Sequence, residues 1–169
     1  TYIKDVRTEA DIEDSSVALS FIIGNPSGKE AVSVEVLDGG KVVASAAGKA
    51  GEALTLKVPG AVLWSPESPR LYHFNATLTR SGKVLDKVSS YFALREVDIR
   101  KDTCGYGRIC LNGEPVFQFG TLDQGWWPDG LLTPPSEEAM LWDMVELKKM
   151  GFNTVRKHIK VEPELYYYY

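Results

Sequence analysis

Residues 16–48 read SVALSFIIGNPSGKEAVSVEVLDGGKVVASAAG, and this stretch decides the fold of the first part of the chain. Apolar and polar residues alternate along most of it, which is typical of antiparallel strands with one buried face. The segments NPSG (25–28) and DGG (38–40) divide it, and their glycines supply the positive φ that tight connections require. The stretch therefore predicts strands joined by short turns.

The same pattern continues up to about residue 98. The further runs are EALTLKV (52–58), LYHFNATLTR (71–80) and LDKVSSYFALREVDI (85–99). SGK at 81–83 is another turn signal, and the series shows no helical periodicity. About seven strands in roughly 100 residues predict a mainly β protein, in which residues 1–98 form an immunoglobulin-like antiparallel β-sandwich.

The pattern changes after residue 98. RICLNGEPVFQFG (108–120) places an Asn-Gly pair between apolar runs, which is the strongest short-range hairpin signal. A loop, TLDQGWWPDGLLTPP (121–135), leads to SEEAMLWDMVELKKMG (136–151), which is typical of a helix. FNTVR (152–156) then predicts a short strand. A strand, a helix and a second strand form a βαβ unit, which requires a parallel sheet.

Both ends of the predicted helix are marked. Ser136 is the expected N-cap and Gly151 the expected stop. Acidic residues in the first turn and basic residues in the last turn complement the helix dipole. The expected apolar stripe consists of Met140, Leu141, Met144, Val145 and Leu147. This periodicity predicts that one face of the helix is buried.

The last part of the chain is short for the architecture that it suggests. Residues 99–169 number 71 and contain two candidate parallel strands, whereas a (β/α)8 barrel takes about 250 residues. We therefore expect residues 99–169 to be an incomplete barrel segment, the N-terminal βαβ fragment of a (β/α)8 barrel. On this interpretation the chain is part of a longer protein.

Composition and charge exclude several classes of partner. The 169 residues carry a formal net charge of −4, so no basic face for nucleic acid is expected. No apolar run approaches the roughly 20 residues that span a bilayer, and no membrane partner is expected. The first residues lack the pattern of a signal peptide. Oligomeric state is left open.

The two cysteines, Cys104 and Cys110, leave two interpretations open. A hairpin that turns at Tyr106 and Gly107 would place them opposite each other, at a distance suited to a disulfide. The favoured alternative is a pair of free, half-buried thiols. A zinc site is not predicted, because the other two ligands are missing.

Two motifs carry a family resemblance. WSPESPRLY (64–72) resembles the segment that precedes the last strands of the sandwich domain in glycoside hydrolase family 2, which includes β-galactosidases, β-glucuronidases and β-mannosidases. LNGEPVFQFG (111–120) and KKMGFNTVRKHIKVEP (148–163) resemble the entry into the catalytic barrel of the same family. The motifs occur in order over most of the chain, from about residue 55 onward.

The resemblance implies a retaining O-glycosyl hydrolase that acts on β-linked glycosides with two glutamates, one the acid/base and one the nucleophile. It places both glutamates on later barrel strands, beyond residue 169, so no catalytic residue is assigned here and the chain by itself is expected to be inactive. It further implies a carbohydrate substrate, no cofactor, and a periplasmic or secreted location.

Arg156 and His158 match the family segment at the end of the second barrel strand, where side chains face the sugar pocket. Such sites lie at the carboxyl ends of barrel strands. The alternative is that Arg156 is a structural ion-pair partner and His158 a polar residue at a strand end. Lys160 extends this basic cluster, which would favour an anionic sugar such as a uronate through charge-assisted hydrogen bonds. The alternative for the cluster is a solvated loop.

Trp126 and Trp127 lie in the loop after the first barrel strand and are expected to stack on sugar rings, although one of them is expected to pack under the rim instead. Glu162 and Glu164 are interpreted as acids at a helix N-terminus that begins near Pro163. The four-residue spacing of His158 and Glu162 does not predict a metal site, because the intervening β-branched residues oppose a helix.

The competing hypothesis is a non-catalytic β-sandwich module that binds carbohydrate or protein. It leaves the βαβ pattern and the Arg-Lys-His segment unexplained. A carbohydrate-binding sandwich would also need exposed aromatic residues along one sheet face, and the strand pattern does not show them.

Overall fold

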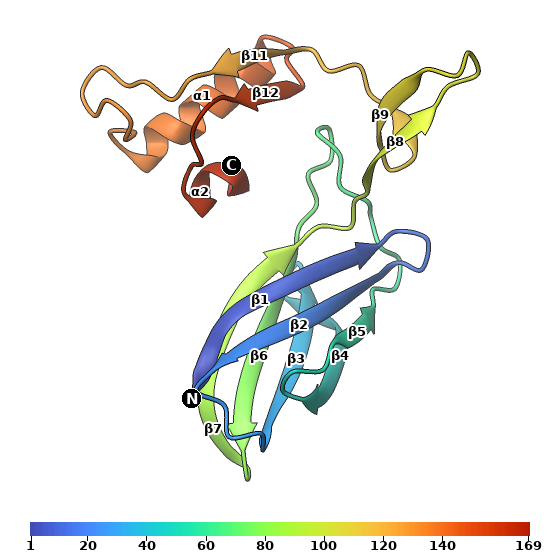
Figure 1. Ribbon diagram of the computed structural model, residues 1–169, viewed down its shortest axis with the longest axis vertical. Helices are drawn as coiled ribbons and strands as arrows, with labels where there is room; N and C mark the ends of the chain where they lie inside the picture. The colour runs from blue at the N-terminus through green and yellow to red at the C-terminus, as the bar shows by residue number, and fades with distance from the viewer. The chain divides into compact units, whose positions relative to one another are not determined.

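The computed structural model describes all 169 residues, which form two compact units, Thr1–Val116 and Phe117–Tyr169 (Figure 1). None of the helices has the length and apolar character needed to cross a membrane.

The first unit is an antiparallel β-sandwich, as predicted. One sheet has the order β1-β2-β5 and the other β4-β3-β6-β7. The strands of the first sheet are β1 (Tyr2–Asp11), β2 (Ser16–Gly24) and β5 (Leu54–Lys57). Those of the second are β3 (Glu30–Asp38), β4 (Lys41–Lys49), β6 (Tyr72–Arg80) and β7 (Lys83–Phe92). Figure 1 shows β1 and β2 lying across the second sheet.

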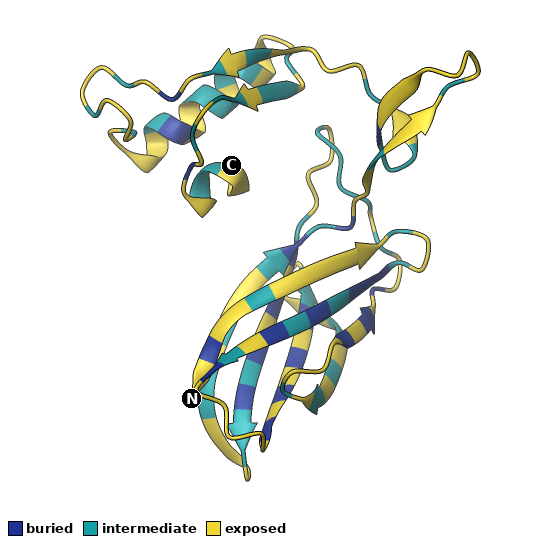
Figure 2. Ribbon diagram, in the orientation of Figure 1, coloured by how far each residue is buried: buried dark blue, intermediate teal, exposed yellow.

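The core lies between these two sheets. Strand β3 alternates between buried and exposed residues except at its last two positions, and β6 alternates between buried and more exposed residues over most of its length (Figure 2). Buried apolar side chains from both sheets meet in one cluster, which includes Val17, Leu19, Val34, Phe74 and Leu78. Burial of this apolar surface is the dominant favourable term in folding, which is why the alternating runs were a reliable signal.

Two features of the sandwich differ from the sequence pattern. The run 85–99 was predicted as one stretch of strand, yet it contributes to β7 and to β8 (Val97–Lys101), which belong to different sheets. Strand β1 was not among the predicted runs. It is almost entirely exposed and has an irregularity between Ile3 and Asp5, so it shows no clean alternation.

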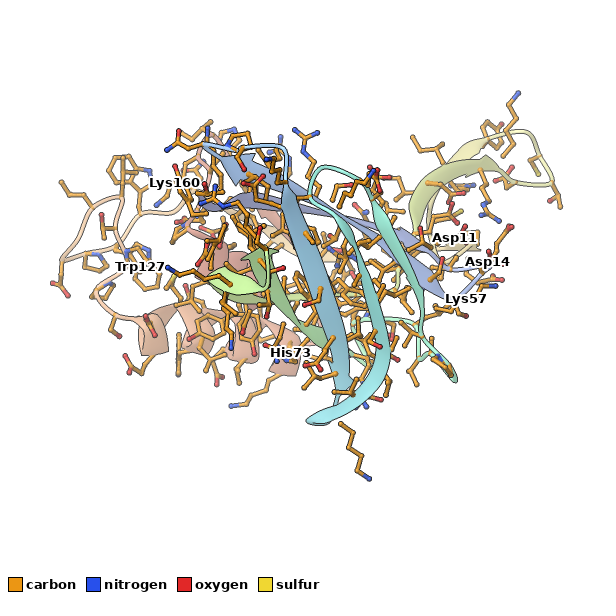
Figure 3. The ribbon with its side chains drawn as sticks, turned by 90° about the horizontal axis from the view of Figure 1, so that it is seen from below. Asp11, Asp14, Lys57, His73, Trp127 and Lys160 are labelled. Atoms are coloured by element: carbon orange, nitrogen blue, oxygen red, sulfur yellow. The ribbon has the colours of Figure 1, made fainter.

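The turn after β1 carries Asp14, which forms an ion pair with Lys57 of β5 at 3.7 Å; both residues are labelled in Figure 3.

A small antiparallel sheet follows, with the order β10-β9-β8. Strand β9 spans Gly107–Leu111 and β10 spans Glu114–Pro115. Asn112 and Gly113 connect them with φ of 52° and 85°, which confirms the predicted Asn-Gly hairpin. The Asn112 amide also donates to the carbonyl oxygen of Trp64 at 3.0 Å, which ties this hairpin to the WSPESP segment.

The predicted disulfide alternative is wrong. Both cysteines are free, and Cys104 lies in the connection between β8 and β9, while Cys110 lies on β9 opposite Asp98. The thiols are not half-buried either, because Cys104 is exposed and Cys110 is buried. The cysteines are not opposite each other because Cys104 lies in a turn beyond the last paired residues, Lys101 and Gly107. Asp102 holds this turn, since its carboxylate accepts hydrogen bonds from the backbone N–H groups of Cys104 and Tyr106, each at 2.9 Å.

A buried carboxylate organises the turn between β2 and β3. Glu30 accepts hydrogen bonds from the Ser27 hydroxyl at 2.6 Å and from the N–H groups of Ser27, Gly28 and Lys29 at 3.0–3.2 Å. The Ser27 hydroxyl is the main cause of a pKa lowered from 4.5 to about 2, and the backbone donors add to it while burial opposes it.

This lowered pKa predicts acid sensitivity of the sandwich. Because the folded-state pKa lies below the ordinary value, the stabilisation is fully present above pH 4.5 and is lost as the pH falls from 4.5 toward 2. The variant Glu30→Gln should melt at a lower temperature than the wild type at pH 7, and the gap should close on acidification over that range. Calorimetry from pH 2 to 7 measures it. The control Glu52→Gln, at an exposed turn position, should leave the profile unchanged, and a gap independent of pH would contradict the prediction.

The second unit contains the predicted βαβ arrangement. Strand β11 (Gly120–Asp123) pairs in parallel with β12 (Thr154–Lys157), and α1 (Glu137–Lys149) connects them; a short helix, α2 (Glu164–Tyr168), follows. Strand β11 overlaps the start of the stretch 121–135 that was predicted to be a loop, so the loop begins three residues later. The cause is the pairing of Thr121, Leu122 and Asp123 with β12.

The ends of α1 are as predicted, but its buried stripe is narrower. The Ser136 hydroxyl accepts a hydrogen bond from the N–H of Ala139 at 3.2 Å, and Gly151 has a φ of 89° just past the helix. Met140 is buried, and Met144 and Leu147 are half-buried. The predicted stripe residues Leu141 and Val145 are exposed.

Candidate functional site at the carboxyl ends of the parallel strands

The paired strands β11 and β12 present two different faces. Leu122 lies opposite Arg156 and Asp123 opposite Lys157, so the two pairs point to opposite sides of the strands. Leu122 and Arg156 are exposed, whereas the side chains of Asp123 and Lys157 are largely covered. The carboxyl end of this pair therefore has one covered charged face and one open face.

Asp123 links four parts of the covered face. Its Oδ2 accepts hydrogen bonds from Lys157 Nζ at 2.9 Å and from the Tyr166 hydroxyl at 2.7 Å, and its Oδ1 accepts one from the N–H of Gly125 at 2.7 Å. Its main-chain oxygen accepts a further hydrogen bond from the N–H of His158 at 2.9 Å. Burial alone would raise the pKa of Asp123, but the bonds from Tyr166 and Lys157 outweigh it and lower the pKa.

Lys157 lies between two carboxylates. Its ammonium contacts Asp123 Oδ2 at 2.9 Å and forms an ion pair with Glu162 Oε1, and it also lies over the ring of Tyr166, 5.0 Å from the centroid. Burial works to lower the pKa of Lys157, but the hydrogen bonds to Glu162 and Asp123 raise it overall. For Tyr166 burial and the hydrogen bond to Asp123 act in the same direction, because both disfavour the phenolate, and they raise its pKa. Lys157 therefore stays charged and fixed.

Glu162 is the buried centre of the group. Only 2 % of its side chain is exposed, and Oε1 pairs with both Lys157 and Lys160, the latter at 3.0 Å. Its Oε2 is buried and has no hydrogen-bond partner. The interpretation of Glu162 as a helix N-terminal acid is therefore wrong, because its side chain turns inward to the lysines. Glu164 does lie in the first turn of α2.

Lys160 lies beside the loop 124–136. Its ammonium pairs with Glu162 and also donates to the carbonyl oxygen of Leu132 in that loop. Figure 3 labels Lys160 and also Trp127, which belongs to the loop 124–136. Lys160 thus pairs with Glu162, and Lys157 pairs with both Glu162 and Asp123. Both lysines of the segment therefore face carboxylates of the protein.

Arg156 and His158 occupy the same segment in a different manner. Arg156 is exposed, and its guanidinium makes no hydrogen bond or ion pair. His158 is half-buried, and its Nδ1 is buried without a hydrogen-bond partner. Arg156 is therefore the cation at this end of the strands that lacks a protein acceptor.

The tryptophans of the loop differ in exposure. Trp126 is 62 % exposed, while Trp127 is half-buried and pairs with Leu131 through two backbone hydrogen bonds of 2.7 and 3.1 Å. Trp126 lines an open hollow of about 460 Å³ between the loop and α1, together with Asp123, Asp143 and Met144 among others. Burial, followed by the charge of Asp123, raises the pKa of Asp143 at this hollow.

Most of the charged group on the covered face was not predicted from the sequence. Asp123, Lys157 and Tyr166 were not selected as site residues, and Glu162 was given another role. Asp123 and Lys157 stand at the last positions of β11 and β12, just beyond the predicted strand ends, and the predicted parallel pairing of these strands is the one signal that could have paired them. Nothing in the local sequence around Tyr166 indicates its bond to Asp123, 43 residues away.

Comparison with known proteins gives the family. The model of glycosyl hydrolases family 2 matches residues 1–95, more than half of the sequence. The chain belongs to glycosyl hydrolase family 2, which confirms the resemblance carried by its motifs.

Two curated relatives are similar over different lengths. A putative β-glucuronidase of Formosa agariphila is 34 % identical over 132 residues, which cover 76 % of this chain and 12 % of the relative. A β-galactosidase of Lactococcus lactis is 34 % identical over 96 residues, which cover 56 % of this chain and 9 % of the relative. The chain thus spans about a tenth of the length of these relatives.

The fold also occurs in solved structures. The β-glucuronidase of Ruminococcus gnavus superposes with a TM-score of 0.82 at 24 % identity, over 99 % of this chain and 27 % of that protein. An FMN-binding β-glucuronidase of Faecalibacterium prausnitzii gives a TM-score of 0.78, also at 24 % identity, over 96 % of this chain and 25 % of that protein. At this level of identity the likeness establishes the fold.

Proposed function

We propose that this chain is part of a retaining glycoside hydrolase that cleaves β-linked O-glycosidic bonds. Family membership and the printed names of the relatives, β-glucuronidase and β-galactosidase, support this activity. In a retaining mechanism two carboxyl groups about 5–5.5 Å apart act as acid/base and nucleophile. On this proposal both glutamates lie outside residues 1–169, and the chain contributes part of the wall of the sugar pocket.

The proposed architecture is an immunoglobulin-like sandwich over residues 1–98, followed by the opening βαβ unit of a (β/α)8 barrel over 99–169. The observation that carries it is the parallel pair β11–β12 joined through α1. Parallel strands need neighbours on both sides and helices over them, which a barrel supplies. Active sites of such barrels lie at the carboxyl ends of the strands, where the open face of β11–β12 presents Arg156.

Arg156 and His158 are proposed to bind the sugar from that open face, and Trp126 and Trp127 to line the rim. Aromatic faces and charge-assisted donors are suited to sugar rings and their substituents. Lys160 has two protein acceptors, which favours a supporting role over direct contact with the sugar. Selectivity for an anionic sugar such as a uronate would therefore rest on Arg156 in this part of the pocket.

The test is hydrolysis of a panel of nitrophenyl β-glycosides by the longer protein that contains this chain. Residues 1–169 alone should show no turnover. In the longer protein, Arg156→Gln should lower kcat/KM by about 10–100-fold, because it removes hydrogen bonds from a charged donor. The loss should be larger for a β-glucuronide than for a β-galactoside if the sugar is a uronate.

Arg7→Gln is the matched control, since Arg7 is exposed on β1 in the sandwich and should leave kcat/KM unchanged. Turnover by residues 1–169 alone would contradict the placement of the catalytic glutamates. Wild-type kcat/KM of Arg156→Gln on every sugar would contradict the proposed contact between Arg156 and the sugar.

A further inference from the structure

The loop 124–136, which joins β11 to α1, is held closed within itself. The N–H of Trp127 donates to the Leu131 oxygen and the N–H of Leu131 donates back to the Trp127 oxygen. These bonds make the middle of the loop a small closed turn that carries both tryptophans near its base. The orientation of that turn depends on how the flanking residues of the loop are fixed.

Both flanks are fixed by the charged group on the covered face. At the start of the loop, the N–H of Gly125 donates to Asp123 Oδ1 at 2.7 Å. Near its end, the carbonyl oxygen of Leu132 accepts a hydrogen bond from the Lys160 ammonium. One residue on each side of the Trp127–Leu131 turn, Gly125 before it and Leu132 after it, is thus bound to one network.

Gly125 allows the loop to approach this network closely. Its φ is 71°, and a Cβ at this position would lie 2.7 Å from Lys157 Nζ and 3.2 Å from Glu162 Oε1. The loop backbone therefore rests directly on the charged group, with no side chain between them. The position of Lys157 therefore limits how the loop can lie at this point.

The two attachments converge on Glu162. One of its oxygens, Oε1, holds Lys157, which in turn holds Asp123, and it also holds Lys160. Two ammonium groups stabilise this buried carboxylate, and removing its charge would leave both of them without their shared partner. The position of the loop thus depends on a residue that lies outside it.

We propose that Glu162 is a positioning residue that fixes the tryptophan loop 124–136 through Lys157 and Lys160. The fixing of the loop by Glu162 is a structural role that does not depend on the enzyme activity. The consequence for catalysis, which rests on the proposed function, is that Glu162 controls how Trp126 meets the sugar or the group attached to it. Glu162 acts through the loop and has no contact with the substrate.

Amide hydrogen exchange and ¹⁹F NMR of the 169-residue chain, labelled with 5-fluorotryptophan, test the structural part. Glu162→Gln should accelerate exchange at Gly125 by about tenfold or more, because the hydrogen bond to Asp123 opens more often. It should shift or broaden the Trp126 and Trp127 resonances and leave that of Trp64 unchanged. The matched control Glu164→Gln removes the same charge two residues away, in the exposed first turn of α2, and should leave all these signals in place.

Two further variants separate the two attachments and cover the case in which Glu162→Gln does not fold. Lys160→Met should affect the end of the loop near Leu132 while Gly125 keeps its protection. Lys157→Met should accelerate exchange at Gly125 and leave the end of the loop near Leu132 unchanged. In the longer protein, Glu162→Gln should raise KM about tenfold with a smaller change in kcat, since binding contacts of the loop are lost, and Glu162→Asp should restore part of the affinity.

Unchanged exchange at Gly125 in both Glu162→Gln and Lys157→Met, together with unchanged tryptophan resonances in Glu162→Gln and Lys160→Met, would overturn the proposal. If these local signals change while the longer protein hydrolyses no β-glycoside, the proposed function fails and the positioning role stands. If the longer protein is active and the loop does not respond, the positioning role fails alone.

Discussion

Replacing Phe74 with alanine is expected to lower the free energy of unfolding of the first unit by about 3–5 kcal/mol. Phe74 lies on β6 with 0 % of its surface exposed, and its ring is 6.4 Å from that of Phe92. The substitution removes an aromatic ring from between the two sheets and leaves a cavity that the neighbouring strands fill only in part. Urea denaturation followed by circular dichroism measures the change.

Phe117 provides the matched control for this variant. It is 84 % exposed, so Phe117→Ala removes the same atoms without creating a cavity. The expected change is within about 0.5 kcal/mol, as for most surface substitutions. A loss of less than about 1 kcal/mol in Phe74→Ala would contradict the placement of this ring at the centre of the sandwich.

Replacing Gly120 with alanine is expected to separate β11 from β12. A Cβ on Gly120 would overlap the backbone carbonyl oxygen of Thr154, which cannot turn aside as a flexible side chain can. Asn153, the residue before Thr154, bonds to Phe119 through its backbone N–H and its Oδ1, at 3.0 and 2.9 Å. The strands are thus held together on this side, and the added methyl group should destabilise the second unit by about 3 kcal/mol or more.

Amide exchange of the 169-residue chain is the measurement for Gly120→Ala. Protection should fall across residues 119–123 and 153–157 while the sandwich keeps its protection. The control is Gly107→Ala on β9, where an added Cβ would lie 3.4 Å from the Ile99 side chain, an ordinary contact. If Gly120→Ala leaves the β11–β12 amides as protected as in the wild type, the close backbone approach does not exist in solution.

Local signals in the sequence predicted the elements whose stability is decided locally. Alternation in residues 31–37 predicted β3 because one face of that strand is buried from Glu30 to Val36. Ser136 and Gly151 marked the ends of α1 because capping involves neighbouring residues only. Strand β1 escaped prediction because its backbone pairs with β2 while most of its side chains face solvent.

The candidate site was predictable only in part, for a related reason. Arg156, His158 and Lys160 stand close together in sequence, and the family motif drew attention to them. The partners of the lysines are Asp123 and Glu162, and whether Lys157 meets them depends on which side of β12 it occupies. That choice is made by the pairing of β11 with β12, and the sequence of neither strand decides it alone.

The two faces of β11–β12 also give the chain a way to distinguish correct from incorrect strand pairing as it folds. A slip of β12 by one residue would turn Lys157 toward the open face and bring Arg156 under α2. Glu162 would then keep Lys160 but lose Lys157, and Asp123 would lose its bond to the Lys157 ammonium. The charged group thus favours the register in which Lys157 faces both carboxylates.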